Sequence, residues 1–191
     1  MVRHVVHGKP QERSDDQIDD LKNSVVHMKR LILEEANLVG NLNKIILCGI
    51  SQGAATALCT LFDVKTKLCG FLGFATWLPE YCKIERGNPA LRTPKFMAHN
   101  RNDDVINIDY GVAAREHLNS LGGEVVEWHR YNSGGHWMNE LNVANNVVHP
   151  SGIDDMVKFM QLITGTFEGN YFTGGLARAP GPEPAAKCEP Q

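Results

Sequence analysis

The sequence predicts an α/β fold with a mostly parallel sheet flanked by helices. Segments with helical spacing of apolar residues alternate with short apolar runs along most of the chain. The runs, such as Ile45 to Leu47, are continuously apolar rather than alternating, as expected for strands that are buried on both faces. Strands that alternate with helices favour right-handed crossovers, and these produce a parallel sheet.

Composition and charge indicate one globular domain that needs neither a disulfide nor a structural metal ion for stability. The chain has 191 residues, 42% of them hydrophobic, and a formal net charge of −3. A domain of this size buries roughly 70% of the surface that its unfolded chain exposes, so it can hold a core without disulfides or structural metal. No basic run is present of the kind that nucleic acids or anionic membranes attract. We therefore expect neither as a partner.

The sequence also predicts a soluble, cytoplasmic protein. No apolar run approaches the ~20 residues that a membrane-spanning helix needs, so we expect no stable membrane insertion. The first residues lack the apolar segment of a secretory signal. The 5 cysteines are odd in number and form no CxxC motif, which favours reduced thiols in a cytosol-like compartment.

Four helices are expected. The first carries apolar residues three and four positions apart, starting from Ile18, which gives one helical stripe. Polar residues of the N-cap type precede the first and the last helix, and glycines follow the first and the third. The four expected helices cover residues 14–40, 52–62, 109–121 and 151–164.

Five segments are expected to be strands, and one segment is expected to be disordered. Residues 1–172 are assigned to the folded domain, whereas residues 173–191 are rich in Pro and Gly and hold too little apolar surface to offset the entropy of ordering. The five expected strands cover residues 3–7, 42–51, 68–77, 95–100 and 124–131.

The most specific local motif is GISQG, from Gly49 to Gly53, placed between an expected buried strand and a helix of small residues. A nucleophile elbow needs this context, because glycines on both sides let backbone and helix approach while the Ser51 hydroxyl stays exposed. The Gln52 N–H at the helix start is a candidate donor to an oxyanion. The alternative interpretation is a Gly/Ser turn without a nucleophile.

A serine nucleophile requires a base and an orienting acid, which in this topology follow in the order Ser, Asp, His. The loop after the strand 95–100 offers Asp103 or Asp104, and the loop after the strand 124–131 offers His136. Asp in a polar loop is more often a turn former, and a histidine after two glycines can be a plain surface residue. Three candidates in this order at one sheet edge nevertheless favour a catalytic triad.

Other residues are assigned more ordinary roles. Trp77 and Leu78 follow an expected strand at the same sheet edge, where they would form an apolar wall for a substrate, or a half-buried part of the core. Cys48 lies inside a strand, which favours a buried apolar role, and the sequence implies no partner for His99. The sequence contains no metal-binding, dinucleotide-binding or phosphate-loop motif, so we expect no metal and no cofactor.

Four segments together resemble the acyl-protein thioesterase/phospholipase-carboxylesterase group of α/β-hydrolases, particularly its fungal members. The segments are NKIILCGISQGAATAL, FLGFATWLP, HNRNDDVIN and YNSGGHWMN. The resemblance implies an α/β-hydrolase fold and hydrolysis of esters or thioesters of apolar acyl groups, either small or protein-linked. It also implies that Ser51 is the nucleophile, that the acid is Asp103 rather than Asp104, and that His136 is the base.

The sequence departs from the family pattern in two places. It lacks the family's first strands and the loop of the type Leu-His-Gly-x-Gly-Asp that supplies the second oxyanion N–H, and loss of one such donor typically costs 10²–10³ in rate. It also carries Asn100 where the family commonly has Gly. We therefore expect a serine hydrolase, with a weak or inactive binding protein as the alternative. A homodimer that covers the exposed sheet edge is a further expectation.

Overall fold

Four parallel strands form the central sheet of the protein. The computed structural model describes residues 15–123, 126–138, 142–144, 147–149 and 152–166. Within these residues the strands are adjacent in the order β1-β2-β3-β4, and every pair is parallel. The sequence-based prediction of a parallel α/β sheet is confirmed. The strands are β1 (Ile46–Ile50), β2 (Gly70–Phe74), β3 (Lys95–Asn100) and β4 (Val126–Tyr131).

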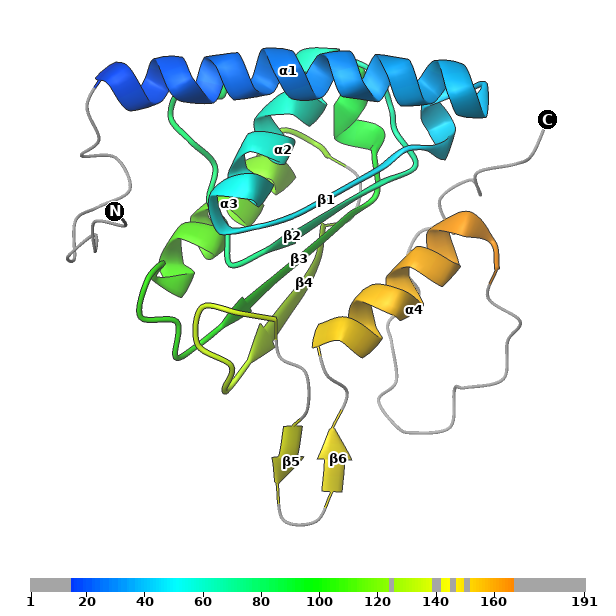
Figure 1. Ribbon diagram of the computed structural model, residues 1–191. Helices are drawn as coiled ribbons and strands as arrows, with labels where there is room; N and C mark the ends of the chain where they lie inside the picture. The colour runs from blue at the N-terminus through cyan, green and yellow to red at the C-terminus, as the bar shows by residue number, and fades with distance from the viewer. Residues whose placement is uncertain (1–14, 124–125, 139–141, 145–146, 150–151, 167–191) are drawn as a thin grey trace.

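Helices cover both faces of this sheet (Figure 1). One apolar cluster joins one face of the sheet to α1, α2 and α3, and a second cluster joins the other face to α4. Because β2 and β3 lie in the middle and are covered on both sides, every residue of these two strands is buried. The helices are α1 (Asp15–Val39), α2 (Ser51–Val64), α3 (Ile108–Ser120) and α4 (Gly152–Thr164).

Two strands are shorter than the sequence predicts, and local turns explain both differences. Leu42–Lys44 forms a 3-10 helix, η1, whose N-cap Asn41 accepts a hydrogen bond from the Asn43 N–H, so β1 begins only at Ile46. At the far end of β2, Ala75 adopts a φ of 50°, which ends the extended backbone before Trp77. A continuous apolar run does not reveal either turn.

A small hairpin is present that the sequence pattern does not predict. Strands β5 (Asn142–Ala144) and β6 (Val147–His149) pair antiparallel with each other. Strands of 3 residues are too short to display a period of two, so pattern analysis has nothing to detect. The expected strand 3–7 and the expected tail 173–191 lie outside the described residues.

The prediction that Cys48 is buried is wrong. Cys48 is exposed, whereas Cys59, Cys69 and Cys82 are buried, and all four are free thiols. The physical reason is the position of β1 at the edge of the described sheet. Helix α4 packs over the central strands β2 and β3, so it does not cover the Cys48 side chain on β1.

No helix in the described part of the chain is long and apolar enough to span a lipid bilayer.

A charged cluster joins β4 to α4. The His129 Nε2 lies 2.9 Å from Glu127 Oε1, and its Nδ1 lies 3.4 Å from Asp155 Oδ2. The Tyr131 hydroxyl donates to the same Asp155 oxygen over 2.8 Å. Burial alone lowers the pKa of His129, but the interactions with Asp155 and Glu127 outweigh it and raise the pKa to about 9. The imidazolium is therefore the form that holds α4 against the sheet at neutral pH.

This cluster predicts a loss of stability at alkaline pH. A raised pKa in the folded state adds stability that is fully present below the unfolded value of about 6.5 and is lost as the pH rises through about 9. We expect the melting temperature to fall by about 3–6 °C between these pH values, measured by circular dichroism. The variant His129→Asn should lose most of this dependence, and an equally steep decline in that variant would contradict the assignment.

Candidate active site

Ser51 lies in a strained turn at the end of β1. β1 ends at Ile50 and α2 begins at Ser51, whose φ of 54° falls in the left-handed region. A non-glycine residue in this region costs of order 1–3 kcal/mol and persists only where the surroundings impose it. The Thr76 hydroxyl donates to the Ser51 carbonyl over 3.2 Å. The turn thus presents the serine side chain at the carboxyl edge of the sheet, as the GISQG motif predicts.

The two glycines of this motif play different roles. A Cβ on Gly49 would lie 2.6 Å from the Ala54 backbone nitrogen, whereas a Cβ on Gly53 would meet nothing within 4 Å. The expectation that both glycines permit close approach therefore holds for Gly49 only. In the described part of the chain, α2 has space for a side chain at position 53.

Asp103 is held in a fixed position by its own loop. The Asp103 Oδ1 accepts hydrogen bonds from the N–H groups of Val105 and Ile106, each over 2.9 Å. Its side chain has an exposed fraction of 0%, whereas Asp104 is exposed. Of the two candidates left open by the residue pattern, Asp103 is the one directed into the site.

Asp103 and His136 form a close pair across the ends of β3 and β4. The His136 Nδ1 lies 2.9 Å from Asp103 Oδ2 and 3.1 Å from Oδ1. Burial raises the pKa of Asp103, but hydrogen bonds from His99, His136, Ile106 and Val105 outweigh it and lower the pKa to about 2. The carboxylate is ionised at neutral pH and accepts from the Nδ1–H. This bond selects the tautomer whose Nε2 is free to act as a base.

His99, for which the sequence implied no partner, has two in the structure. His99 is fully buried at the end of β3, and its Nε2 lies 2.9 Å from the Ile106 carbonyl oxygen and 3.2 Å from Asp103 Oδ2. The carboxylate thus contacts two imidazole rings. A signal was present in the sequence, since His99 opens the HNRNDDVIN loop that contains Asp103.

The other predicted residues, Ser51 and Gln52, lie at the same edge of the sheet but are less directly connected to the Asp103–His136 pair. Gln52 is the second residue of α2, and the first N–H groups of a helix have no intrahelical partner. Among the described residues, the structure forms no hydrogen bond between the Ser51 hydroxyl and His136; the Ser51 bond to Thr76 involves the backbone carbonyl. The structure therefore brings Asp103 and His136 together and places Ser51 on the neighbouring elbow.

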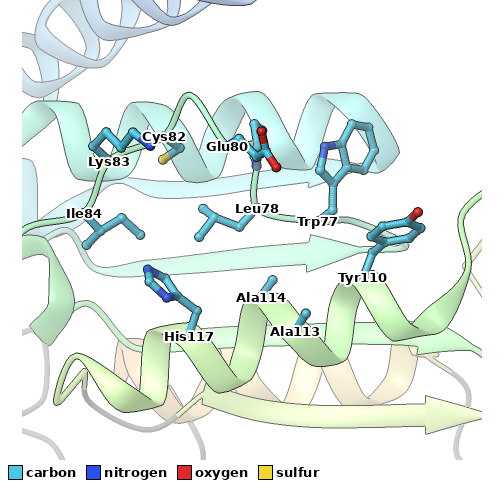
Figure 2. A pocket seen from close by; sticks show the side chains of 11 residues that line it. Trp77, Leu78, Glu80, Cys82, Lys83, Ile84, Tyr110, Ala113, Ala114 and His117 are labelled. Carbon is cyan, nitrogen blue, oxygen red and sulfur yellow. The ribbon is translucent and has the colours of Figure 1, made fainter. Parts of the chain in front are cut away.

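A pocket with mixed apolar and polar walls lies near the elbow, and its lining does not include Ser51, Asp103 or His136. It has a volume of about 390 Å³ and lies between the segment 77–84 and α3. Trp77 and Tyr110 lie at one end, and Ile84 and His117 lie at the other (Figure 2). Trp77 directly follows Thr76, which binds the Ser51 carbonyl, so the aromatic end of the pocket is the end next to the serine. Both predicted substrate-binding residues, Trp77 and Leu78, line this pocket.

Within the described residues, no group of three or more His, Cys, Asp and Glu side chains is arranged to hold a metal ion.

Comparison with known proteins identifies the family. The family model for phospholipases and carboxylesterases matches residues 4–148. The chain belongs to the phospholipase/carboxylesterase family. The resemblance noted from the sequence motifs is thus confirmed, and the α/β-hydrolase fold is the framework in which the site residues are placed.

Curated relatives of this phospholipase/carboxylesterase family member include acyl-protein thioesterases of fungi. This chain is 36% identical over 111 residues to acyl-protein thioesterase 1 of Yarrowia lipolytica, and the match covers 56% of this chain and 49% of the relative. It is 32% identical over 162 residues to acyl-protein thioesterase 1 of Candida albicans, covering 82% of this chain and 65% of the relative. The chain thus spans about half to two thirds of the length of these relatives.

Solved structures support the same fold. Esterase PE8 superposes with a TM-score of 0.62 at 22% identity, covering 78% of this chain and 66% of that chain. Acyl-protein thioesterase 2 of Zea mays superposes with a TM-score of 0.55 at 23% identity, covering 81% and 69%. At these identities the likeness concerns the fold of this family member.

The elbow predicts opposite effects for two similar substitutions. In Gly49→Ala the new Cβ would lie 2.6 Å from the Ala54 nitrogen, so we expect the free energy of unfolding to fall by about 1–3 kcal/mol. In Gly53→Ala the methyl group enters open space on a helix, and we expect a gain of about 0.5–1 kcal/mol. Urea unfolding measures both. Equal effects of the two substitutions would contradict the packing described for the elbow.

Proposed function

We propose that this chain is a serine hydrolase that cleaves carboxylic ester or thioester bonds of acyl substrates through an acyl-enzyme. The observation that carries the proposal is the hydrogen bond between the buried Asp103 carboxylate and the partly buried His136, at the sheet edge where Ser51 occupies a strained elbow. Membership of a family of phospholipases and carboxylesterases and the thioesterase names of the fungal relatives support the same chemistry.

The proposed mechanism assigns one role to each residue. His136 Nε2 takes the proton of the Ser51 hydroxyl, while Asp103 holds the ring and stabilises the imidazolium that forms. The serine oxygen attacks the acyl carbonyl, and the Gln52 N–H at the positive end of α2 binds the oxyanion. His136 then protonates the leaving alcohol or thiol, and water, activated by the same base, hydrolyses the acyl-enzyme. Since the Ser51 hydroxyl and His136 are not hydrogen bonded in the described residues, the bond forms as substrate binds.

We assign the acyl group of the substrate to the pocket between Trp77 and α3. Its middle is lined by Leu78 and by alanines of α3, and its aromatic end adjoins the serine elbow. A hydrocarbon chain would gain free energy of about 0.8 kcal/mol for each buried CH₂. We therefore place the acyl chain between Trp77 and α3, with the scissile carbonyl at Ser51.

A binding protein without catalysis is the second candidate, and one observation favours it. The described residues form no Ser51–His136 hydrogen bond, and Gln52 is the single oxyanion donor that we assign. Loss of an oxyanion donor typically lowers the rate 10²–10³-fold. The two candidates differ in whether Ser51 is an activated nucleophile.

Covalent labelling decides between them. We expect a fluorophosphonate to add one adduct to the purified chain, detected by intact mass, because an activated serine displaces the fluoride. Ser51→Ala should abolish the adduct, and Ser24→Ala, which alters a serine on α1, should keep it. Folded protein that remains unlabelled would eliminate the hydrolase in favour of the binding protein.

The acid of the proposed triad predicts a large kinetic effect. We expect Asp103→Asn to lower kcat about 10⁴-fold, because the amide favours the wrong tautomer of His136. Asp104→Asn is the matched control in the same loop and should change kcat less than about twofold. Hydrolysis of p-nitrophenyl esters measures both rates. A comparable loss in the two variants would remove Asp103 from its assigned role.

The pocket predicts a change in acyl preference. Trp77→Ala removes the aromatic wall next to the serine, so we expect kcat/KM for p-nitrophenyl octanoate to fall about tenfold or more. The rate with p-nitrophenyl acetate, whose acyl group does not reach the pocket, should stay within about twofold. A parallel decline for both esters would indicate that Trp77 supports the fold rather than the acyl chain.

A further inference from the structure

Asn100 ends β3 and contacts the segment that contains His136. Its side chain is fully buried, with an exposed fraction of 0%. The Nδ2 donates one hydrogen bond to the Gly135 carbonyl over 2.8 Å and a second to the Trp137 carbonyl over 2.6 Å. These two carbonyls belong to the residues immediately before and after His136. A single amide group therefore holds both neighbours of the proposed base.

The role of the Asn100 amide in the site is to donate hydrogen bonds. Both partners are carbonyl oxygens, so only the NH₂ group can face them. The Asn100 Oδ1 is buried and has no hydrogen-bond partner among the described residues. A buried acceptor without a partner costs free energy, so the favourable contribution of the Asn100 side chain comes from the two bonds that its Nδ2 donates.

The opposing loop is shaped to receive this side chain. Gly134 has a φ of 128°, and a Cβ at that position would lie 2.6 Å from the Asn100 Nδ2. The loop also bonds to the segment after β3 at a second point, where the Asn102 Oδ1 accepts from the Gly135 N–H over 3.1 Å. Only a glycine fits against Asn100 here, so the loop and the amide form one packed unit.

We propose that Asn100 is a positioning residue that holds His136 against Asp103 by binding the carbonyls on both sides of it. This inference rests on the hydrolase function proposed above, although the geometry it concerns can be measured without catalysis. Asp103 fixes the imidazole ring through Nδ1, and Asn100 fixes the backbone that carries the ring. The family resemblance of the sequence motifs implies glycine at this position, so it gives no reason for an asparagine there.

Two variants of Asn100 test the proposal. Asn100→Asp keeps the shape but places an acceptor against two carbonyls, and Asn100→Gly removes the donors without adding charge. We expect kcat for p-nitrophenyl esters to fall about 10-fold to 100-fold in both, because a small displacement of a catalytic group is costly. KM should stay within about twofold, since Asn100 does not line the pocket.

A second measurement reports directly on the hydrogen bond between Asp103 and His136. The His136 Nδ1 proton, shared with an ionised carboxylate, gives a downfield proton resonance in NMR spectra that can be assigned by its loss in Asp103→Asn. We expect this resonance to weaken or disappear in both Asn100 variants. This readout needs no turnover. If the wild-type chain hydrolyses no ester, the proposed function fails, and the resonance still tests whether Asn100 holds His136.

Asn88 provides a matched control. It is also buried, its Nδ2 donates to the Phe62 carbonyl over 2.9 Å, and it lies away from the site. Asn88→Asp should lower the melting temperature yet keep kcat within about twofold and keep the His136 resonance. The proposal is overturned if either folded Asn100 variant retains the wild-type kcat and resonance, or if Asn88→Asp loses them equally. If Asn100→Asp does not fold, the kcat and the resonance of Asn100→Gly decide the question.

Discussion

The buried carboxylate of Asp103 is the interaction on which the rest of the site depends. It accepts two backbone N–H bonds from its own loop and lies against the rings of His99 and His136. A charge without solvent is stable only when such partners surround it. The chain after β3 must therefore fold back on itself, and the loop after β4 must approach it, before this carboxylate can be buried. Its burial connects the local turn to the geometry of the proposed base.

Strand β3 supplies both supports of the pair. Its last two residues, His99 and Asn100, point to opposite faces of the sheet because side chains alternate along a strand. His99 reaches the carboxylate of Asp103, and Asn100 reaches the backbone around His136. Since β3 is a central strand buried along its whole length, these supports come from a rigid part of the sheet, as a precise site requires.

Much of this arrangement could be predicted from the sequence, and the remainder could not for identifiable reasons. Parallel strands place their carboxyl ends at one edge, so the order of Ser51, Asp103 and His136 along the chain was enough to predict that they lie at the same edge. The contact of His99 depends on a loop that returns to the strand, which periodicity does not encode. Cys48 was misplaced because a pattern shows that a residue is apolar but does not show whether a helix covers it.

The parallel pairing of the four described strands has a consequence for how the site forms. Neighbouring parallel strands are joined by long crossovers, so each pairing closes a large loop and such sheets assemble slowly. Asp103 and His136 come from the last two strands of the order β1-β2-β3-β4, and His136 leaves the ribosome well after the elbow does. An intermediate with only β1 and β2 paired would hold a formed turn at Ser51 and no base. The chemistry proposed for this chain can therefore begin only after β3 and β4 have joined the sheet, which would keep a partly folded chain from acting on acyl groups.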